Sequence, residues 1–202
     1  MSHNRTEEIV VATTNRGKIV EIQKILSGSP YEFVPITQFD EHFSVEEDGM
    51  SYAENAIKKA RRASLTTGKI ALADDSGLEV DALGGAPGIY SARFGGEDLP
   101  FSEKIARLLR QMDGQVQRTA RFRCVIVVSS PKGAVVSSEG VCEGAISAEP
   151  RGTNGFGFDP IFWVPAYQKT MAELSAEIKN EISHRARALQ HVPALIEQVL
   201  AA

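Results

Sequence analysis

Short apolar runs alternate with amphipathic segments in the first part of the chain. The runs at residues 9–12 and 70–73 are typical of buried strands, and residues 31–36 predict another strand between them. Polar residues 13–15 after the first run can cap a helix. Apolar positions then recur at a helical spacing, at Ile19, Ile22, Ile25 and Leu26. Residues 51–66 predict a longer helix of the same amphipathic kind.

The apolar run at residues 70–73 continues directly into Asp74-Asp75-Ser76-Gly77. Because this polar segment resembles a turn, we expect the strand to end at the two aspartates, with another short strand over 78–80. The glycines at 84, 85 and 88 then predict a loop.

The second half has a different pattern. Two β-rich runs, 121–128 and 134–142, flank a Pro-Lys-Gly segment and predict an antiparallel hairpin. A helix is predicted before the hairpin, over 101–112, and a glycine-rich loop after it, over 151–159. Thr170 and Glu173 fit a capping box. One last helix is predicted from near Ser183, with apolar residues at Ala186, Leu189, Val192, Leu195, Ile196 and Val199.

This order of elements predicts an α/β protein with a mixed, partly antiparallel central sheet flanked by helices. We expect residues 9–202 to form one domain of two lobes, because no repeat or linker divides them. Residues 1–8 are polar and are expected to form a short disordered leader, not a signal peptide.

Composition narrows the possible functions. The chain has 202 residues, and 22 Lys plus Arg against 26 Asp plus Glu leave a formal charge of −4. That charge disfavours a protein that wraps a polymeric nucleic acid, but it permits a small anionic ligand. No apolar run approaches the roughly 18 residues of a membrane helix. We therefore expect a cytoplasmic protein, with Cys124 and Cys142 as two thiols; a disulfide between neighbouring strands is the alternative.

The strand–loop–helix turn at residues 13–18 is the first candidate site. Backbone N–H groups and the positive end of a helix favour a phosphate there, and Lys18 adds a full charge. The segment is not a Walker A loop, because Ala12 replaces its first glycine and Ile19 replaces its magnesium-binding hydroxyl residue. A plain helix cap with a solvated lysine is the alternative.

Carboxylates and a helix face form the next candidates. Glu46-Glu47-Asp48 and Asp74-Asp75 could supply two carboxylates to one Mg²⁺, which takes oxygen ligands. A solvated acidic loop and an ordinary turn are the alternatives. Asn55 and Lys59, four residues apart on one helix, share a face and could both reach a ligand. Alternatively, they belong to a solvated basic stripe.

The last candidate pairs Gly155-Phe156-Gly157-Phe158-Asp159-Pro160 with Ser183-His184-Arg185. Glycines allow the backbone to approach a ligand closely, and aromatic faces can stack on a nucleobase. An arginine can donate to the O6 and N7 acceptors of a 6-oxopurine. A loop with core phenylalanines beside an ordinary helix start is the alternative.

Taken in order, these motifs resemble the inosine triphosphate pyrophosphatase family over about residues 9–195. The resemblance is carried by Ala12–Lys18 with Glu21, Glu54–Ala56 with Lys59-Ala60, Ala73–Leu78, Gly84–Arg93, Gly155–Phe162 and Ser183–Arg185. It implies a mixed α/β fold with a central substrate cleft, and usually a homodimer. It also implies hydrolysis of ITP, dITP and XTP to the monophosphate and pyrophosphate, which removes deaminated purines from the nucleotide pool.

The resemblance also implies roles for individual residues. The triphosphate would be held by Thr13, Thr14, Asn15, Arg16, Gly17, Lys18 and Lys59. Asp75 would bind Mg²⁺ with Glu46 or Glu47, and would accept a proton from the attacking water. Ser76 would contact substrate. The base and sugar would be contacted by Phe156, Gly157, Phe158, Asp159, Lys179, His184 and Arg185.

Two positions depart from the family's usual pattern. Thr14 stands where many members have glycine, and Ala186 follows His184-Arg185 where glycine is common. Neither departure removes a charged or ligating group. Two other functions remain open: a related pyrophosphatase of the septum-inhibitor type, which acts on pyrimidine or modified nucleotides, and a nucleotide-binding regulator without turnover.

Overall fold

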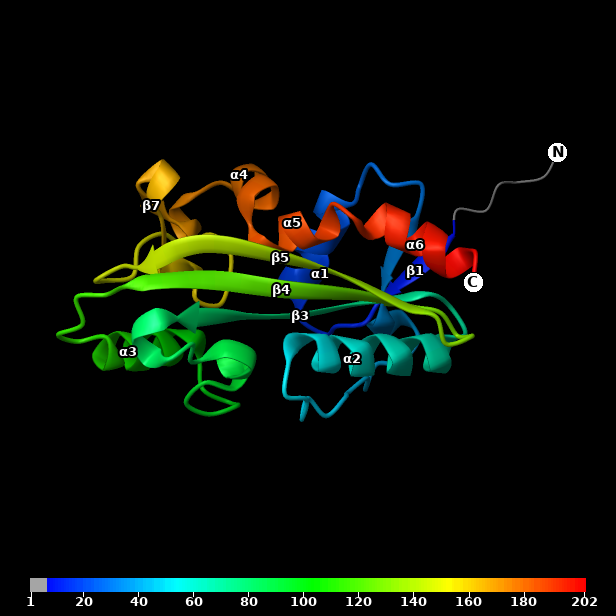
Figure 1. The fold of residues 1–202 in the computed structure, drawn as a ribbon, viewed down its shortest axis with the longest axis horizontal. Helices are drawn as coiled ribbons and strands as arrows, with labels where there is room; N and C mark the ends of the chain where they lie inside the picture. The colour runs from blue at the N-terminus through cyan, green and yellow to red at the C-terminus, as the bar shows by residue number, and fades with distance from the viewer. Residues whose placement is uncertain (1–6) are drawn as a thin grey trace. The chain divides into compact units, whose positions relative to one another are not determined.

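The computed structural model describes residues 7–202 (Figure 1). Of the expected leader, residues 1–6 lie outside the described residues, and Glu8 already begins a strand. The strands of the described chain are β1 (Glu8–Val11), β2 (Glu32–Pro35), β3 (Ala71–Val80), β4 (Thr119–Ser129), β5 (Val135–Ile146), β6 (Phe162–Val164) and β7 (Lys169–Thr170). Its α-helices are α1 (Arg16–Ile25), α2 (Tyr52–Thr67), α3 (Phe101–Gln111), α4 (Ala176–Ile182), α5 (His184–Leu189) and α6 (Val192–Leu200).

The strands form one mixed sheet in the order β2-β1-β3-β4-β5-β6-β7. Strand β1 is parallel to β2 and β3, whereas β6 is antiparallel to β5 and β7. The Ser130 N–H donates to the Ala134 carbonyl at one end of the β4–β5 hairpin, and the Ile146 N–H donates to the Arg118 carbonyl at the other. The hairpin is therefore antiparallel, and the predicted α/β class with a mixed sheet is confirmed.

The chain divides into two compact units. The first unit contains the described residues up to 75 together with 125–139 and 187–202, and the second contains 76–124 and 140–186. Strands β3, β4 and β5 contribute residues to both units. The expectation of a single domain over 9–202 stays a prediction.

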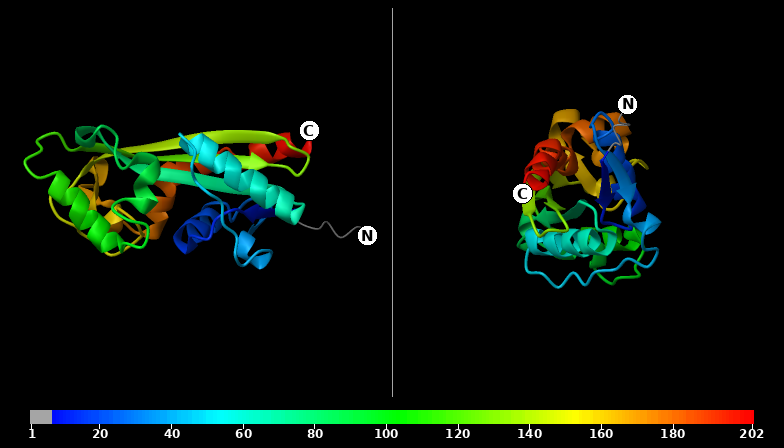
Figure 2. Two further views of the ribbon diagram at one scale, coloured as in Figure 1. Left: turned by 90° about the horizontal axis from the view of Figure 1, so that it is seen from below. Right: turned by 90° about the vertical axis from the view of Figure 1, so that its right-hand side faces the viewer.

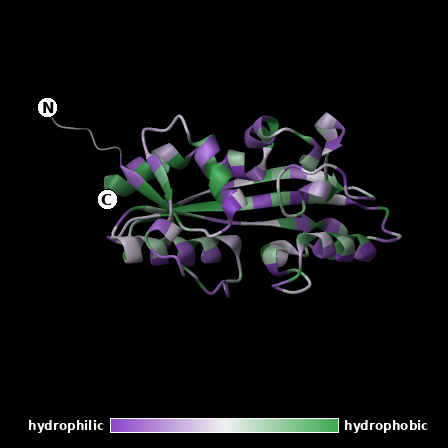
Figure 3. Ribbon diagram, turned by 180° about the vertical axis from the view of Figure 1, so that it is seen from behind, coloured by the Kyte–Doolittle hydropathy of each residue, from purple (hydrophilic) through white to green (hydrophobic). Residues whose placement is uncertain are grey.

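The first unit is built around β1. Ile9, Val10 and Val11 are fully buried, as expected for a strand paired on both sides in a parallel arrangement. Helices α2 and α6 lie on opposite sides of this unit's strands (Figures 1 and 2). Figure 3 shows hydrophobic and hydrophilic residues in turn along the strands and around the helices. Ser51 caps the start of α2, and Gly68 ends it in a left-handed conformation.

Strand β3 corrects the prediction of two short strands. It runs without a break from Ala71 to Val80, so Asp74 and Asp75 lie in its middle and not at its end. The polar Asp-Asp-Ser-Gly segment resembles a turn in sequence, because polar residues and glycine are frequent in turns. Here both aspartates are buried and paired with lysines, so they can remain within a strand.

The last helix is also corrected, because it is two helices. Helix α5 ends at Leu189 and α6 begins at Val192. Pro193 lies in the first turn of α6. A proline has no N–H to donate to the preceding turn, and its ring clashes with that turn's carbonyl, so the helix is interrupted before it.

Two further expectations concern the cysteines and membrane-spanning helices. Cys124 and Cys142 are buried thiols on β4 and β5 and form no disulfide, as predicted. Within residues 7–202, no helix is long and apolar enough to cross a membrane.

The second unit has its own core. Its buried apolar side chains come from β3, from α3 and the residue after it, from β4 and from the segments after β5, and include Leu78, Leu108, Met112, Phe122, Phe158 and Phe162. The predicted capping box of Thr170 and Glu173 is present at the start of a short 3-10 turn. Next to it, the Thr170 hydroxyl donates to the Arg151 carbonyl, and the Asn154 N–H donates to the Ala172 carbonyl. These bonds tie the glycine-rich loop to the chain segment that leads into α4.

Gly152 is the tightest point of this loop. Its φ is +78°, and a Cβ there would overlap the backbone of Ala172. We expect Gly152→Ala to destabilise the protein by about 2–4 kcal/mol, because the strain of a left-handed alanine adds to a clash with backbone that cannot move aside. Gly84→Ala is the matched control, since Gly84 has φ +63° and open space around its Cβ position. Urea unfolding should show only the backbone strain of about 1–2 kcal/mol for Gly84→Ala. Equal losses in the two variants would contradict the clash.

Candidate active site

The first group of polar side chains lies where β1 ends and β3 continues. The last paired residues are Val11 of β1 and Leu72 of β3, so Asp74 and Asp75 lie beyond the carboxyl end of β1. In open α/β sheets, this edge is where ligands usually bind. The predicted location at the end of the strand that begins near residue 70 is therefore wrong, because β3 continues to Val80.

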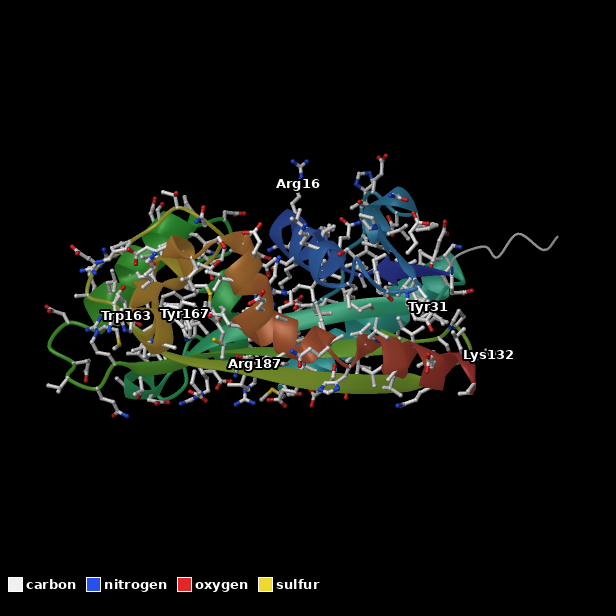
Figure 4. All side chains as sticks on the ribbon, turned by 90° about the horizontal axis from the view of Figure 1, so that it is seen from above. Arg16, Tyr31, Lys132, Trp163, Tyr167 and Arg187 are labelled. Carbon is white, nitrogen blue, oxygen red and sulfur yellow. The ribbon has the colours of Figure 1, made fainter. Side chains whose placement is uncertain are left out.

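The turn after β1 leads into α1. The Asn15 side chain caps the helix by accepting the Lys18 N–H at 3.2 Å, and the Thr13 hydroxyl accepts the Asn15 N–H at 3.2 Å. The N–H groups of the first helical turn are then directed out of the helix end, as an anion site requires. Thr14 and Arg16 are exposed, Gly17 is half-buried, and Figure 4 shows Arg16 pointing away from the ribbon.

Three carboxylates and two lysines of the first unit form what we call the carboxylate cluster: Lys18, Glu47, Lys59, Asp74 and Asp75. Lys18 forms an ion pair with Asp74, whose side chain is fully buried. The Lys59 Nζ lies 2.8 Å from the Glu47 Oε1 and 2.8 Å from the Asp75 Oδ1. Two buried carboxylates of one strand are thus each paired with a lysine from a different helix.

Burial and charge shift the protonation of this cluster. Burial is the largest influence on Asp75 and raises the pKa of its carboxyl above the usual value, although Lys59 and Lys18 act against it. Burial by itself would lower the pKa of Lys59, but the charges of Asp75 and Glu47 outweigh it and raise that pKa. A carboxylate with a raised pKa has the greater proton affinity that a general base needs.

Asn55 holds the acidic loop in place. Its Oδ1 accepts the Gly49 N–H at 2.9 Å, and its Nδ2 lies 3.5 Å from the Asp75 Oδ2. A Cβ on Gly49 would come within 2.6 Å of the Asn55 Oδ1, so only glycine permits this approach. The structure thus gives Asn55 two protein partners, where the sequence suggested a group aimed at a ligand.

The loop contains both glutamates proposed as metal ligands. Glu47 reaches Lys59, whereas Glu46 is exposed to solvent. Within residues 7–202, no group of three or more His, Cys, Asp and Glu side chains is arranged to hold a metal ion. The chemistry of Glu47 and Asp75 still fits Mg²⁺, which often takes one or two protein carboxylates and completes its shell with water and phosphate oxygens.

The second unit carries what we call the aromatic cluster: Ser76, Phe156, Asp159, Lys179 and Arg185. Arg185 is 1% exposed, and its guanidinium donates to the Ser76 hydroxyl at 3.0 Å. The Phe156 ring lies under two cations, 4.7 Å from the Lys179 Nζ and 5.6 Å from the Arg185 Cζ. Two cations from α4 and α5 thus lie against one aromatic ring, and Ser76 belongs to the cluster through its bond with Arg185.

Asp159 is a buried member of the aromatic cluster and contacts two of its other members. Its Oδ2 accepts the Phe156 N–H at 2.9 Å and pairs with the Lys179 ammonium, and the residue is only 2% exposed. A Cβ on Gly155 would overlap that same carboxylate oxygen. Asp159 therefore positions Phe156 and Lys179, although the sequence suggested a direct contact with the base or sugar.

Phe158 is corrected in part. The residue is 3% exposed and its ring packs edge-to-face on Phe94 and Phe101, so the ring is part of the core. Gly157, with φ +67°, is half-buried next to it. His184 is also buried and stacks on the Phe122 ring at 4.8 Å.

Sequence reasoning missed several of the supporting residues. Phe122 supports the His184 ring, and the Gly49 N–H donates to Asn55, although the sequence predicts only a strand residue and a loop residue at these positions. Asp74 was grouped with Asp75, although neighbouring residues on a strand point to opposite faces. That alternation could have indicated that the two aspartates meet different partners.

This arrangement defines a class of protein: a mixed α/β protein with paired carboxylates and lysines beside a helix start, and a separate aromatic–arginine cluster. The Ham1 family matches residues 9–194. A dITP/XTP pyrophosphatase of Desulforamulus reducens is 50% identical over 194 residues, covering 95% of this chain and 96% of that protein. The Bacillus subtilis protein of the same name is 45% identical over 193 residues, covering 95% and 98%.

Solved structures of Ham1 proteins also superpose on this chain. A HAM1 protein from Coxiella burnetii superposes with a TM-score of 0.86 at 43% identity, covering 96% of this chain and 100% of that one. The Staphylococcus aureus Ham1 protein gives 0.84 at 43% identity, covering 95% and 99%. The chain belongs to the Ham1 family, and the predicted resemblance to nucleoside triphosphate pyrophosphatases is confirmed.

The contacts of Asn55 predict that a negative charge at this position lowers the stability of the protein. Asn55→Asp would place a second carboxylate next to Asp75 and remove the amide donor, so we expect it to destabilise the protein by about 3–5 kcal/mol. Asn15→Asp is the matched control, because aspartate caps a helix about as well as asparagine and should change stability by less than about 0.5 kcal/mol. Urea unfolding at neutral pH measures both. A tolerated Asn55→Asp would contradict the placement of Asn55 beside Asp75.

Proposed function

We propose that this protein hydrolyses dITP, XTP and ITP between the α and β phosphates and releases pyrophosphate. The observation that carries the proposal is the pairing of Glu47 and Asp75 around Lys59, next to a helix start that bears Lys18. The names of the relatives support the substrates dITP and XTP. Removal of deaminated purine nucleotides is the role that follows.

Charge and geometry suggest how the first unit would handle the triphosphate. The N–H groups at the start of α1 and the Lys18 ammonium would bind phosphate oxygens. Asp75 would accept a proton from the attacking water, and its raised pKa suits that task. Reactions of this kind depend mainly on positioning and electrostatic stabilisation, which Lys18 and Lys59 would supply to the phosphoryl oxygens.

We propose Glu47 and Asp75 as the residues that would hold Mg²⁺, in place of the earlier choice between Glu46 and Glu47. When bound, the ion would neutralise charge on the phosphates and on the leaving pyrophosphate. Both carboxylates approach one cation already, since Lys59 lies 2.8 Å from each. Glu46, being exposed, lacks that arrangement.

The aromatic cluster would read the base. Asp75 of the carboxylate cluster and Ser76 of the aromatic cluster are consecutive residues of β3. Phe156 offers a ring for stacking, and Arg185 offers donors to the O6 and N7 acceptors of a 6-oxopurine. Adenine presents an N6 donor instead, and each buried group left unsatisfied costs about 1–3 kcal/mol. Two further proposals are a homodimer, which rests on the family resemblance, and a cytoplasmic location, which rests on the two free thiols.

A substrate panel tests the reaction. With Mg²⁺ and equal concentrations of dITP, ITP, XTP, ATP, GTP, dTTP and UTP, we expect pyrophosphate from the first three and little from the others. Pyrophosphate is assayed separately from orthophosphate. Orthophosphate release would refute the proposal, a preference for dTTP or UTP would favour the septum-inhibitor type, and binding without release would favour a regulator.

The variant Asp75→Asn tests the proposed base. An asparagine of the same shape can still accept a hydrogen bond from Lys59, so the fold should persist, but it cannot take a proton from water. We expect turnover to fall by a factor of about 10³ or more. The thermal unfolding temperature is the control for folding. Turnover close to that of the wild type would remove Asp75 from the reaction.

The variant Arg185→Ala tests base recognition. Losing its donors should narrow the preference for ITP over ATP by about tenfold, equal to about 1.4 kcal/mol. Arg187→Ala is the matched control, because Arg187 belongs to the same helix and is exposed. The ratio of kcat/KM for the two substrates is measured in each variant. An unchanged ratio in Arg185→Ala would exclude Arg185 from reading the base.

A further inference from the structure

We propose that Lys59 is an internal counter-ion that occupies the place of the divalent cation in the nucleotide-free protein and leaves it when the nucleotide binds. In this role Lys59 makes metal binding depend on nucleotide binding. The inference rests on the proposed function, because it concerns the magnesium site assigned there to Glu47 and Asp75. It goes beyond that function by describing how the nucleotide-free protein binds the metal ion.

The geometry carries the first step. The ammonium lies 2.8 Å from one oxygen of Glu47 and 2.8 Å from one oxygen of Asp75. The two carboxylates therefore approach a single cationic centre, which is the arrangement that a metal ion bound by the same oxygens would need. An ammonium and a divalent ion cannot both occupy that point, because like charges repel strongly in a partly desolvated site.

The charge balance carries the second step. In the carboxylate cluster, Lys18 pairs with Asp74 and Lys59 pairs with Glu47 and Asp75, so the ammonium of Lys59 already offsets one of the two negative charges that would attract a metal. Once Lys59 departs, Glu47 and Asp75 present two negative charges to a divalent ion. The departing ammonium needs another anion, and a triphosphate supplies one.

The position of Lys59 on the helix makes the movement possible. Helix α2 is fixed by the Ser51 cap and by buried Ala56, Ala60 and Ala63, so the backbone at residue 59 is held. The lysine side chain itself is a flexible four-carbon stem that can carry its ammonium to a new partner. Asn55 meanwhile keeps Asp75 and the Gly49 loop in place. The switch therefore needs only one side chain to move.

The test measures metal binding without nucleotide. Mn²⁺, which resembles Mg²⁺ in its preference for oxygen ligands, is titrated into the nucleotide-free protein and followed by electron paramagnetic resonance. We expect Lys59→Met to bind Mn²⁺ at least tenfold more tightly than the wild type. Lys58→Met is the matched control, because Lys58 is the next residue of α2 and pairs with Asp48 on the exposed side. Its Mn²⁺ affinity should stay within twofold of the wild type.

Equal or weaker Mn²⁺ binding by Lys59→Met than by the wild type would overturn the inference. An equal gain of Mn²⁺ affinity in Lys58→Met would also overturn it.

A second measurement uses the wild type, so that it does not depend on the folding of a variant. The Nζ resonance of Lys59 in ¹⁵N-lysine protein should keep its position when Mg²⁺ alone is added, and move when Mg²⁺ and a non-hydrolysable ITP analogue are added together. A shift with Mg²⁺ alone that equals the shift with both would also overturn it.

These results are independent of the substrate assay. If the wild type releases pyrophosphate from dITP and XTP but Lys59→Met gains no Mn²⁺ affinity, the counter-ion role fails and the proposed function stands. If the wild type releases no pyrophosphate, the proposed function fails, whatever the Mn²⁺ titration shows.

Discussion

The buried charges of β3 are the constraint on which the candidate site depends. Asp74 and Asp75 lie in the middle of a strand, where an isolated carboxylate would be very costly. Each is instead paired with a lysine, Lys18 from α1 and Lys59 from α2. Asn15 and Ser51 cap these two helices, and buried alanines hold α2 in place. The two helices therefore position the lysines that neutralise the buried aspartates of β3.

Glycines impose a second constraint, because backbone must come close to buried polar groups in both clusters. At Gly49 the backbone meets the Asn55 amide, and at Gly155 it meets the Asp159 carboxylate, with no room for a Cβ at either position. Asn55 and Asp159 are thus parallel solutions: each is a buried polar side chain that ties a loop N–H to a charged neighbour. Such preorganisation fits a reaction that depends on positioning more than on covalent chemistry.

Much of the fold could be predicted from local pattern. The apolar run at 9–12, the helical spacing after Asn15 and the hairpin around Pro131–Gly133 were assigned correctly, because periodicity and turn residues act within a few positions. The errors came where distant residues decide. Strand β3 continues through its aspartates because lysines from two helices neutralise them. Phe158 looked like a base-stacking residue, yet Phe94 and Phe101 enclose it in the core.

The sequence by itself determined which residue types were available and, through the order of its motifs, which family the chain belongs to. Only the tertiary structure decided their partners: that Glu47 and not Glu46 reaches Lys59, that Asn55 holds Gly49, and that Asp159 supports Phe156 and Lys179. The physical reason is that a side chain's role depends on burial and on the charge it faces. Both are set by segments far apart in the chain, which no local pattern records.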